Sequence, residues 1–145
     1  MQPEQNMSGV YARNRKQTVF DPIVTAANLQ DKVTLYVMDE KRIPKRWRLI
    51  IGIKLIEAAD RISDCAIAAN ETWPDEKHID LRRDYWRQTI IACKQLDRKL
   101  ARAQKVIPSA TAGSMSEILE LLDKEINLAI QHRDHDKVVP IMKKK

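Results

Sequence analysis

The chain has 145 residues, of which 43% are hydrophobic and 32% charged, and only three are glycine. This length is enough for one domain whose core needs neither disulfides nor metals. The net charge is +6, and no run of about 18 uncharged apolar residues occurs, which excludes a membrane-spanning helix. The N-terminal sequence lacks the apolar block of a signal peptide, so we expect a cytoplasmic protein.

Residues 1–20 are polar and unpatterned, and we expect them to form a flexible, mildly basic N-terminal arm. Asp21-Pro22 then favours a helix start, with the aspartate as N-cap and the proline in the first turn. Apolar residues recur at helical spacing to about residue 40, at Ile23, Ala26, Ala27, Leu29, Val33, Tyr36 and Val37. The pattern predicts the first helix.

A second helix is predicted to begin at Ile43-Pro44 and to end before the break at residues 70–74. Its apolar face comprises Trp47, Ile50, Ile51, Leu55, Ala58, Ile62, Cys65, Ala66 and Ala69. Cys65 and the later Cys93 both lie on apolar stripes, so we expect two reduced thiols in the core.

Asp75 is the predicted cap of a third helix, which continues to about residue 107. The apolar stripe of this helix comprises Leu81, Tyr85, Thr89, Ala92, Cys93, Leu96, Leu100, Ala103 and Ile107. Trp86 falls at the edge of the stripe, and Ile90 and Ile91 fall outside it. Exposed apolar residues of this kind occur at subunit contacts and also singly on ordinary surfaces.

A loop at residues 108–113 separates the third helix from a fourth. Ser114 and Glu117 have the spacing of a capping box, and the apolar positions that follow are Met115, Ile118, Leu119, Leu122, Ile126, Ala129 and Ile130. Residues 136–145 form a basic C-terminal tail. Four amphipathic helices with short connections predict an all-α fold, a single-domain up-down-up-down antiparallel four-helix bundle over residues 21–135.

Positive charge concentrates in the second and third helices. Residues 41–74 carry seven basic and four acidic side chains and residues 75–113 carry nine and five, whereas residues 21–40 and 114–135 are acidic in balance. Six cations of the third helix share an arc of about 100° opposite the apolar stripe. They are Arg83, Arg87, Lys94, Arg98, Arg102 and Lys105, and Lys45, Arg46 and Arg48 extend the basic surface at the start of the second helix.

A cationic line of about 33 Å suits a phosphate backbone, because each ion pair formed there releases a counterion. A charged stripe opposite an apolar face is also what an ordinary solvated helix shows. Such a face usually mixes signs, however, and between Tyr85 and Ile107 six basic residues stand against one acid, Asp97. Charge does not distinguish RNA from an acidic protein, so both remain candidate partners.

No catalytic motif is present. No Glu is followed three residues later by His, as di-iron bundles require, and there is no Arg with a His four to six residues after it, no P-loop, no Gly-x-Ser-x-Gly and no CxxC. His132 and His135 have a spacing that could hold a metal with Asp134 or Asp136, although favourable placement at a helix C-terminus accounts for them more simply. We predict no catalytic residue, no metal and no cofactor.

From Ile43-Pro44-Lys45 to Ala69-Asn70 the sequence resembles a family of small four-helix-bundle proteins. The family includes the accessory variability determinant of diversity-generating retroelements and relatives encoded in ribosomal RNA intervening sequences. The resemblance covers about residues 25–133 and implies a homopentamer with a positive surface that binds a reverse transcriptase and nucleic acid. Trp47-Arg48 stands where relatives often carry Glu-Arg, and the 20-residue N-terminal arm is a second departure.

The sequence is therefore compatible with three functions. The first is a non-enzymatic accessory protein that binds a reverse transcriptase and RNA, or an RNA/DNA hybrid, and assists cDNA synthesis in a retroelement. The second is a structural protein–protein interaction module that binds no nucleic acid. The third is an enzyme or metal protein whose site the motifs do not reveal. The sequence favours the first, as a homo-oligomer with no membrane partner.

Overall fold

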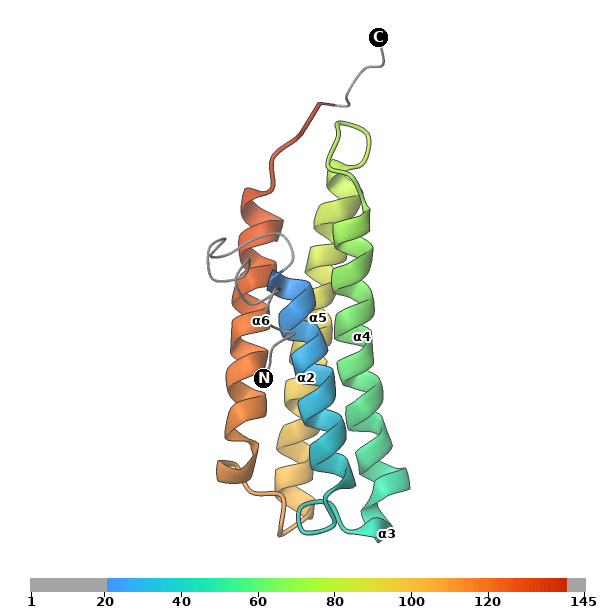
Figure 1. Cartoon of the computed structure of the whole chain (residues 1–145), viewed down its shortest axis with the longest axis vertical. Helices are drawn as coiled ribbons and strands as arrows, with labels where there is room; N and C mark the ends of the chain where they lie inside the picture. Colours follow the sequence, from blue (N-terminus) through green and yellow to red (C-terminus); the bar gives the residue numbers. More distant parts are fainter. Residues whose placement is uncertain (1–20, 141–145) are drawn as a thin grey trace, which may run out of the picture.

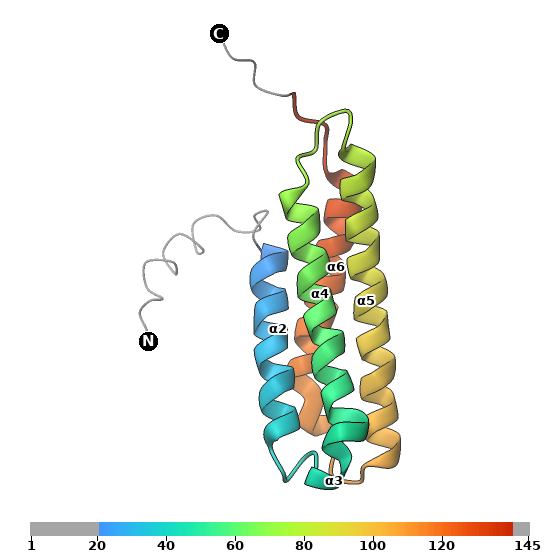
Figure 2. The ribbon, with the colours of Figure 1, turned by 90° about the vertical axis from the view of Figure 1, so that its right-hand side faces the viewer.

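Within residues 21–140, four long helices pack side by side with alternating direction (Figures 1 and 2). The computed structural model describes residues 21–140. The elements in chain order are α2 (Asp21–Met38), α3 (Lys45–Trp47), the π-helical turn η1 (Arg48–Gly52), α4 (Ile53–Glu71), α5 (Ile79–Val106), the 3-10 turn η2 (Gly113–Met115) and α6 (Ser116–His135). The N-terminal arm and the last five residues lie outside the described part of the chain.

The packing follows an antiparallel cycle, in which α2 contacts α4 and α6, and α5 contacts α4 and α6. The chain descends along α2, ascends along α4, descends along α5 and ascends along α6 (Figure 1). This confirms the predicted all-α, up-down-up-down four-helix bundle. No helix within residues 21–140 is long and apolar enough to cross a membrane.

The main core is aliphatic and joins all four helices. Fully buried side chains from successive helices include Leu29, Leu55, Leu96 and Leu122. Cys93 belongs to this core as predicted, whereas Cys65, the other predicted core thiol, is only half-buried; both thiols are free. The connecting segments also contribute, since Ile43 and Ile107 are fully buried.

The upper part of the bundle has a core of its own. In Figure 1, α2 begins about halfway up, so the described helices above it are α4, α5 and α6. Trp86 and Ile90 are buried there with Ala66, Ala69 and Ala129. The prediction for Trp86 and Ile90 was therefore wrong, as was that for Leu81, which is 46% exposed. The buried face of α5 at this end runs through Ile79, Arg82 and Trp86, one residue away from the predicted Leu81–Tyr85 stripe.

A second prediction, that Ile50 lies in the core, is wrong because the chain forms a π-helical turn before α4. Pro44 is the N-cap of α3, and the chain passes through Arg48–Gly52 before α4 begins. A π-turn contains one more residue than an α-turn, which rotates the residues on either side relative to an ideal helix. Ile51 therefore points into the core, whereas Ile50, a predicted core residue, is 61% exposed.

The start of α6 is capped differently from the prediction. Ser114 donates its hydroxyl to the Thr111 carbonyl oxygen and lies 2.6 Å from the Tyr36 hydroxyl, while Glu117 pairs with Lys32 on α2 at 2.8 Å. The predicted Ser114–Glu117 capping box is thus absent. These side chains instead connect the start of α6 to α2 and so hold the two helices together at this end.

Candidate nucleic-acid interface

The six predicted cations of α5 all lie on the outside of the bundle. Arg83 is half-buried and the other five are exposed. The helix places them on one side because its opposite face carries Cys93, Leu96 and Leu100 into the core. The expected line of charge is therefore present, but its two halves differ in their partners.

The upper half of the line is engaged by carboxylates of the same helix. Arg87 forms an ion pair with Asp84 at 3.1 Å, and Arg83 approaches Asp80 at 3.8 Å. Arg83 also donates a hydrogen bond to the Asp136 carbonyl oxygen at 3.2 Å. Both arginines therefore already interact with carboxylate or carbonyl oxygens of the chain.

The lower half of the line is free of such partners. Within residues 21–140, Lys94, Arg98, Arg102 and Lys105 form no ion pair, and all four side chains are exposed. At a rise of about 1.5 Å per residue they extend along roughly 17 Å of α5. This part of the helix is a cationic row without ion-pair partners, which we call the α5 row.

A groove of about 820 Å³ lies beside the α5 row, between α4 and α5. Its cations are Lys54, Arg61, Arg98, Lys99 and Arg102, and its carboxylates are Glu57, Asp60 and Asp64 of α4. Asp60 accepts a hydrogen bond from Gln30 at 2.9 Å, and no ion pair crosses the groove among the described residues. The basic face therefore carries a strip of negative charge along its α4 side.

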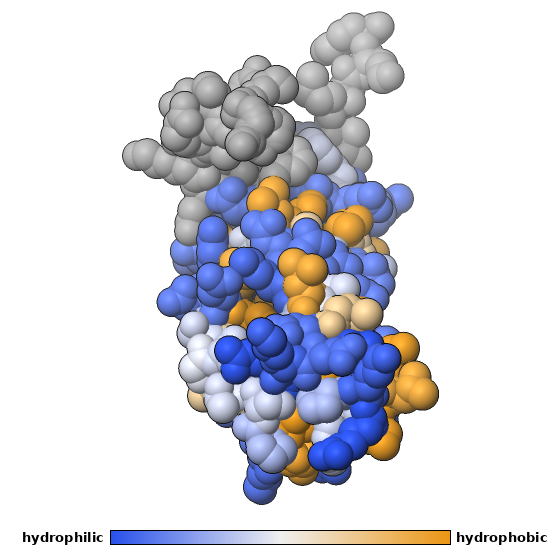
Figure 3. Space-filling view, turned by 60° about the horizontal axis from the view of Figure 1, so that its bottom comes forward, coloured by the Kyte–Doolittle hydropathy of each residue, from blue (hydrophilic) through white to orange (hydrophobic). Residues whose placement is uncertain are grey.

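A second groove, of about 480 Å³, lies at the lower end of the same face. It is lined by Trp47, Ile50, Ile51, Lys54, Lys99, Arg102 and Val106, which include three cations and no carboxylate. Figure 3 shows apolar surface next to strongly hydrophilic surface at this end of the molecule. We call this hollow the end groove.

The three predicted cations at the start of the second helical segment have different environments. Lys45 and Arg46 on α3 are exposed. Arg48 is half-buried, donates to the Met38 carbonyl oxygen at 3.0 Å and lies 3.8 Å from Glu40. Arg48 therefore closes the C-terminal end of α2, and only Lys45 and Arg46 extend the basic surface freely.

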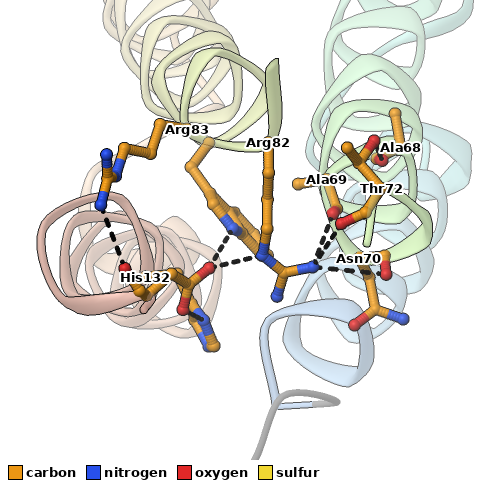
Figure 4. A network of polar contacts seen from close by, with 9 residues as sticks. Ala68, Ala69, Asn70, Thr72, Arg82, Arg83 and His132 are labelled. Atoms are coloured by element: carbon orange, nitrogen blue, oxygen red, sulfur yellow. Dashed lines mark hydrogen bonds and ion pairs between the residues drawn. The ribbon is translucent and has the colours of Figure 1, made fainter. Parts of the chain in front are cut away.

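The upper end of the bundle contains a dense polar network that the sequence did not reveal (Figure 4). Arg82 is only 5% exposed, and its guanidinium donates hydrogen bonds to the carbonyl oxygens of Ala69 and Thr72 at 3.0 and 2.9 Å. It also pairs with Asp136 at 2.6 Å, and that carboxylate is 2.8 Å from His132 Nδ1. The network joins the end of α4, the start of α5 and the end of α6, and we call it the end clasp.

The end clasp is built as a structural element. Trp86 stacks on His132 with ring centroids 4.8 Å apart and donates its indole N–H to Asp136 at 3.1 Å. Burial alone raises the pKa of Asp136, but the hydrogen bonds from His132 and Arg82 outweigh it and hold that pKa below its usual value. Among the described residues, no group of three His, Cys, Asp or Glu side chains is placed to hold a metal.

Glu125 of α6 is the other polar group that the sequence did not single out. It is fully buried, and neither carboxyl oxygen has a hydrogen-bond partner within residues 21–140. Burial raises its pKa to about 8, while Lys124 acts in the opposite direction. Burial also raises the pKa of Cys93, and the Glu125 charge adds to that effect. The arrangement is a neutral carboxylic acid inside the core at neutral pH.

Comparison with known proteins identifies no relative for this chain. No family model, no curated protein and no solved structure matches it. What is shown is the class of the protein, an antiparallel four-helix bundle with a basic face along α5.

Proposed function

We propose that the chain is a non-enzymatic accessory protein that binds RNA through the α5 row. The observation that carries the proposal is that Lys94, Arg98, Arg102 and Lys105 are exposed, in line and without carboxylate partners among residues 21–140. Surface lysines and arginines usually lie within reach of acids that compensate them, as Arg83 and Arg87 do here. A row without ion-pair partners favours a polyanionic ligand, because binding then releases the ligand's counterions.

The proposal assigns the protein to a retroelement. There it would bind a reverse transcriptase and its RNA, or an RNA/DNA hybrid, in the cytoplasm and assist cDNA synthesis without performing chemistry itself. The support is the resemblance to the accessory variability determinant family at Ile43-Pro44-Lys45 and Ala69-Asn70, together with the four-helix fold that the family implies. The family's Pro-Lys position coincides with the start of α3.

Self-association is part of the same proposal. The helices α2, α4 and α6 are acidic in balance, whereas α5 carries eight basic and three acidic side chains. Opposite faces of opposite sign suit a ring in which one copy's basic side faces the next copy's acidic side, as in the family's homopentamer.

A second candidate function is a protein–protein interaction module that binds no nucleic acid. It is favoured by the carboxylates Glu57, Asp60 and Asp64 beside the α5 row, which repel phosphates, and by the exposed Leu49, which is 81% accessible. Large exposed apolar side chains are typical of docking surfaces for proteins.

The salt dependence of RNA binding separates the two functions. Four phosphate contacts predict a log–log slope of about −3 for a single strand and about −4 for a duplex. The wild-type protein should show this slope in fluorescence-anisotropy titrations with a labelled RNA. A flat salt dependence, or no binding at low salt, would leave only the protein-interaction function. Co-purification of a co-expressed reverse transcriptase with the full chain then tests the retroelement assignment.

A further inference from the structure

The end groove differs from the α5 row in its chemistry. Its walls combine Trp47 with the aliphatic side chains of Ile50 and Val106, and its cations are Lys54, Lys99 and Arg102. The groove contains no carboxylate, unlike the neighbouring groove between α4 and α5. Its volume of about 480 Å³ lies within the usual range of small-ligand sites, about 300–1,000 Å³. The groove therefore suits a flat or compact apolar group that is attached to an anion.

The groove is also continuous with the α5 row. Arg102 belongs to both, since it stands third in the row and lines the end groove. A chain of phosphates lying on Lys94, Arg98 and Arg102 would therefore arrive directly at the groove. Figure 3 shows apolar surface beside hydrophilic surface at this end of the bundle.

We propose that the end groove accepts an unpaired base of a single-stranded nucleic acid, while Lys99 and Arg102 hold the adjoining phosphates. This inference rests on the proposed RNA binding and specifies the form of RNA that is bound. Bases have an apolar face that stacks on aromatic and aliphatic side chains, and they are linked to an anionic backbone. In a duplex the bases are stacked inside the helix, so only a single strand can place one in the groove.

An acidic peptide is the main competitor for the same surface. Glu57, Asp60 and Asp64 of the adjoining groove repel the carboxylates of such a peptide as they repel phosphates, so they do not decide between the two ligands. A nucleic acid needs only one line of contact, and the α5 row provides that line on the side of the helix away from the core. Continuity between the row and the groove thus favours the single strand.

Three labelled probes test the inference with the full chain. They are an oligouridine of about 12 nucleotides, an abasic oligomer with the same ribose-phosphate backbone, and an RNA duplex of the same length. We expect the oligouridine to bind about tenfold more tightly than the abasic oligomer, because stacking adds to the phosphate contacts. We also expect it to bind more tightly than the duplex.

The Ile50→Ser, Val106→Ser double variant removes the apolar wall without changing charge. Both side chains are at the surface, so the fold should be retained. We expect the affinity of the variant for oligouridine to fall about tenfold and to equal its affinity for the abasic oligomer. The affinity for the abasic oligomer should be the same as that of the wild type. The matched control is Val24→Ser, Leu35→Ser on α2, where two exposed apolar residues lie outside the groove and binding should not change.

The outcomes separate the inference from the proposed function. Equal binding of oligouridine and abasic oligomer, an equal loss of both in the double variant, or a preference for the duplex overturns the inference and leaves phosphate binding intact. Binding of an acidic peptide in place of the oligonucleotides overturns the inference and, since no nucleic acid is then bound, the proposed function as well. Failure of all three probes to bind overturns both the inference and the proposed function.

Discussion

Arg82 and Asp136 form a buried ion pair in which the arginine Nε lies 2.6 Å from the carboxylate, with side chains only 6% and 14% exposed. Arg82 is in the first turn of α5, and Asp136 directly follows α6. The same guanidinium caps carbonyl oxygens at the end of α4. One buried cation thus satisfies two helix ends at the part of the bundle where the described structure has three helices.

Replacing this arginine should be strongly destabilising. Arg82→Ala leaves the Asp136 carboxylate and the α4 carbonyl oxygens without their donor, and breaking a buried ion pair costs about 3–5 kcal/mol. The free energy of unfolding from urea denaturation measures the loss. Arg87→Ala is the matched control, because its ion pair with Asp84 is on the surface and such pairs contribute about 0–1 kcal/mol. Similar losses in the two variants would show that the end clasp contributes no special stability.

Neutralising the α5 row should abolish RNA binding without affecting the fold. In the variant Lys94→Gln, Arg98→Gln, Arg102→Gln, Lys105→Gln all four cations without ion-pair partners are lost, so affinity at physiological salt should fall about a hundredfold or more. Anisotropy measures affinity, and thermal denaturation should stay near that of the wild type, since exposed substitutions rarely shift stability by more than about 0.5 kcal/mol each.

The control variant Arg83→Gln, Arg87→Gln removes two cations that already have carboxylate partners. For each charge removed, this control should lower the affinity for RNA far less than the variant of the α5 row does. An equal effect per charge would mean that the bound RNA responds to net charge and not to the row.

Hydrophobic periodicity predicted the bundle because most core positions obey it. Leu29, Leu55, Leu96 and Leu122 lie where the spacing put them. The prediction from periodicity was wrong where a polar residue is buried or where the helix is irregular. Arg82 takes an inward position because the α4 carbonyl oxygens and Asp136 satisfy it, and a pattern based on hydropathy assigns that face to Leu81 instead.

The candidate site was predicted in part for related reasons. The sequence placed six cations on one side of α5, but it could not show which of them carboxylates engage, since Asp80 and Asp84 are i−3 neighbours whose rotamers decide this. Lys54 and Lys99 were missed because the end groove forms only where the π-turn and α5 meet. Glu125 was missed because charged residues are rarely buried without a partner.

The buried Glu125 predicts that stability decreases with pH. Its pKa is about 8 in the fold and near 4.5 in the unfolded chain, so the native state retains a proton that the unfolded state has lost. The associated stability is fully present below about pH 4.5 and is lost as the pH rises to about 8, by roughly 4–5 kcal/mol at 1.36 kcal/mol per unit. Lys124 lowers the pKa of Glu125, and the Glu125 charge in turn raises that of Cys93.

The measurement is the free energy of unfolding in urea from pH 5 to pH 8. Glu125→Gln removes the ionisation and should give a profile that lacks this decrease. Glu120→Gln changes an exposed glutamate of the same helix and should keep the wild-type slope. A wild-type profile as flat as that of Glu125→Gln would contradict a raised pKa for the buried carboxyl.

The close approach of Val37 on α2 requires a glycine at position 52, the last residue of the π-turn. A Cβ added there would lie 2.7 Å from the Val37 Cγ1 atom, closer than side-chain carbons approach one another, and valine has little freedom to move. Gly52→Ala should therefore destabilise the protein by about 1–3 kcal/mol, although alanine is normally the better helix former. The second variant, Val37→Ala, leaves a cavity and is destabilising by itself. The double variant should be more stable than the sum of the two losses predicts, because the new methyl group occupies space that the valine has left. Urea denaturation of the three variants measures this coupling, and strict additivity would show that the two positions do not touch.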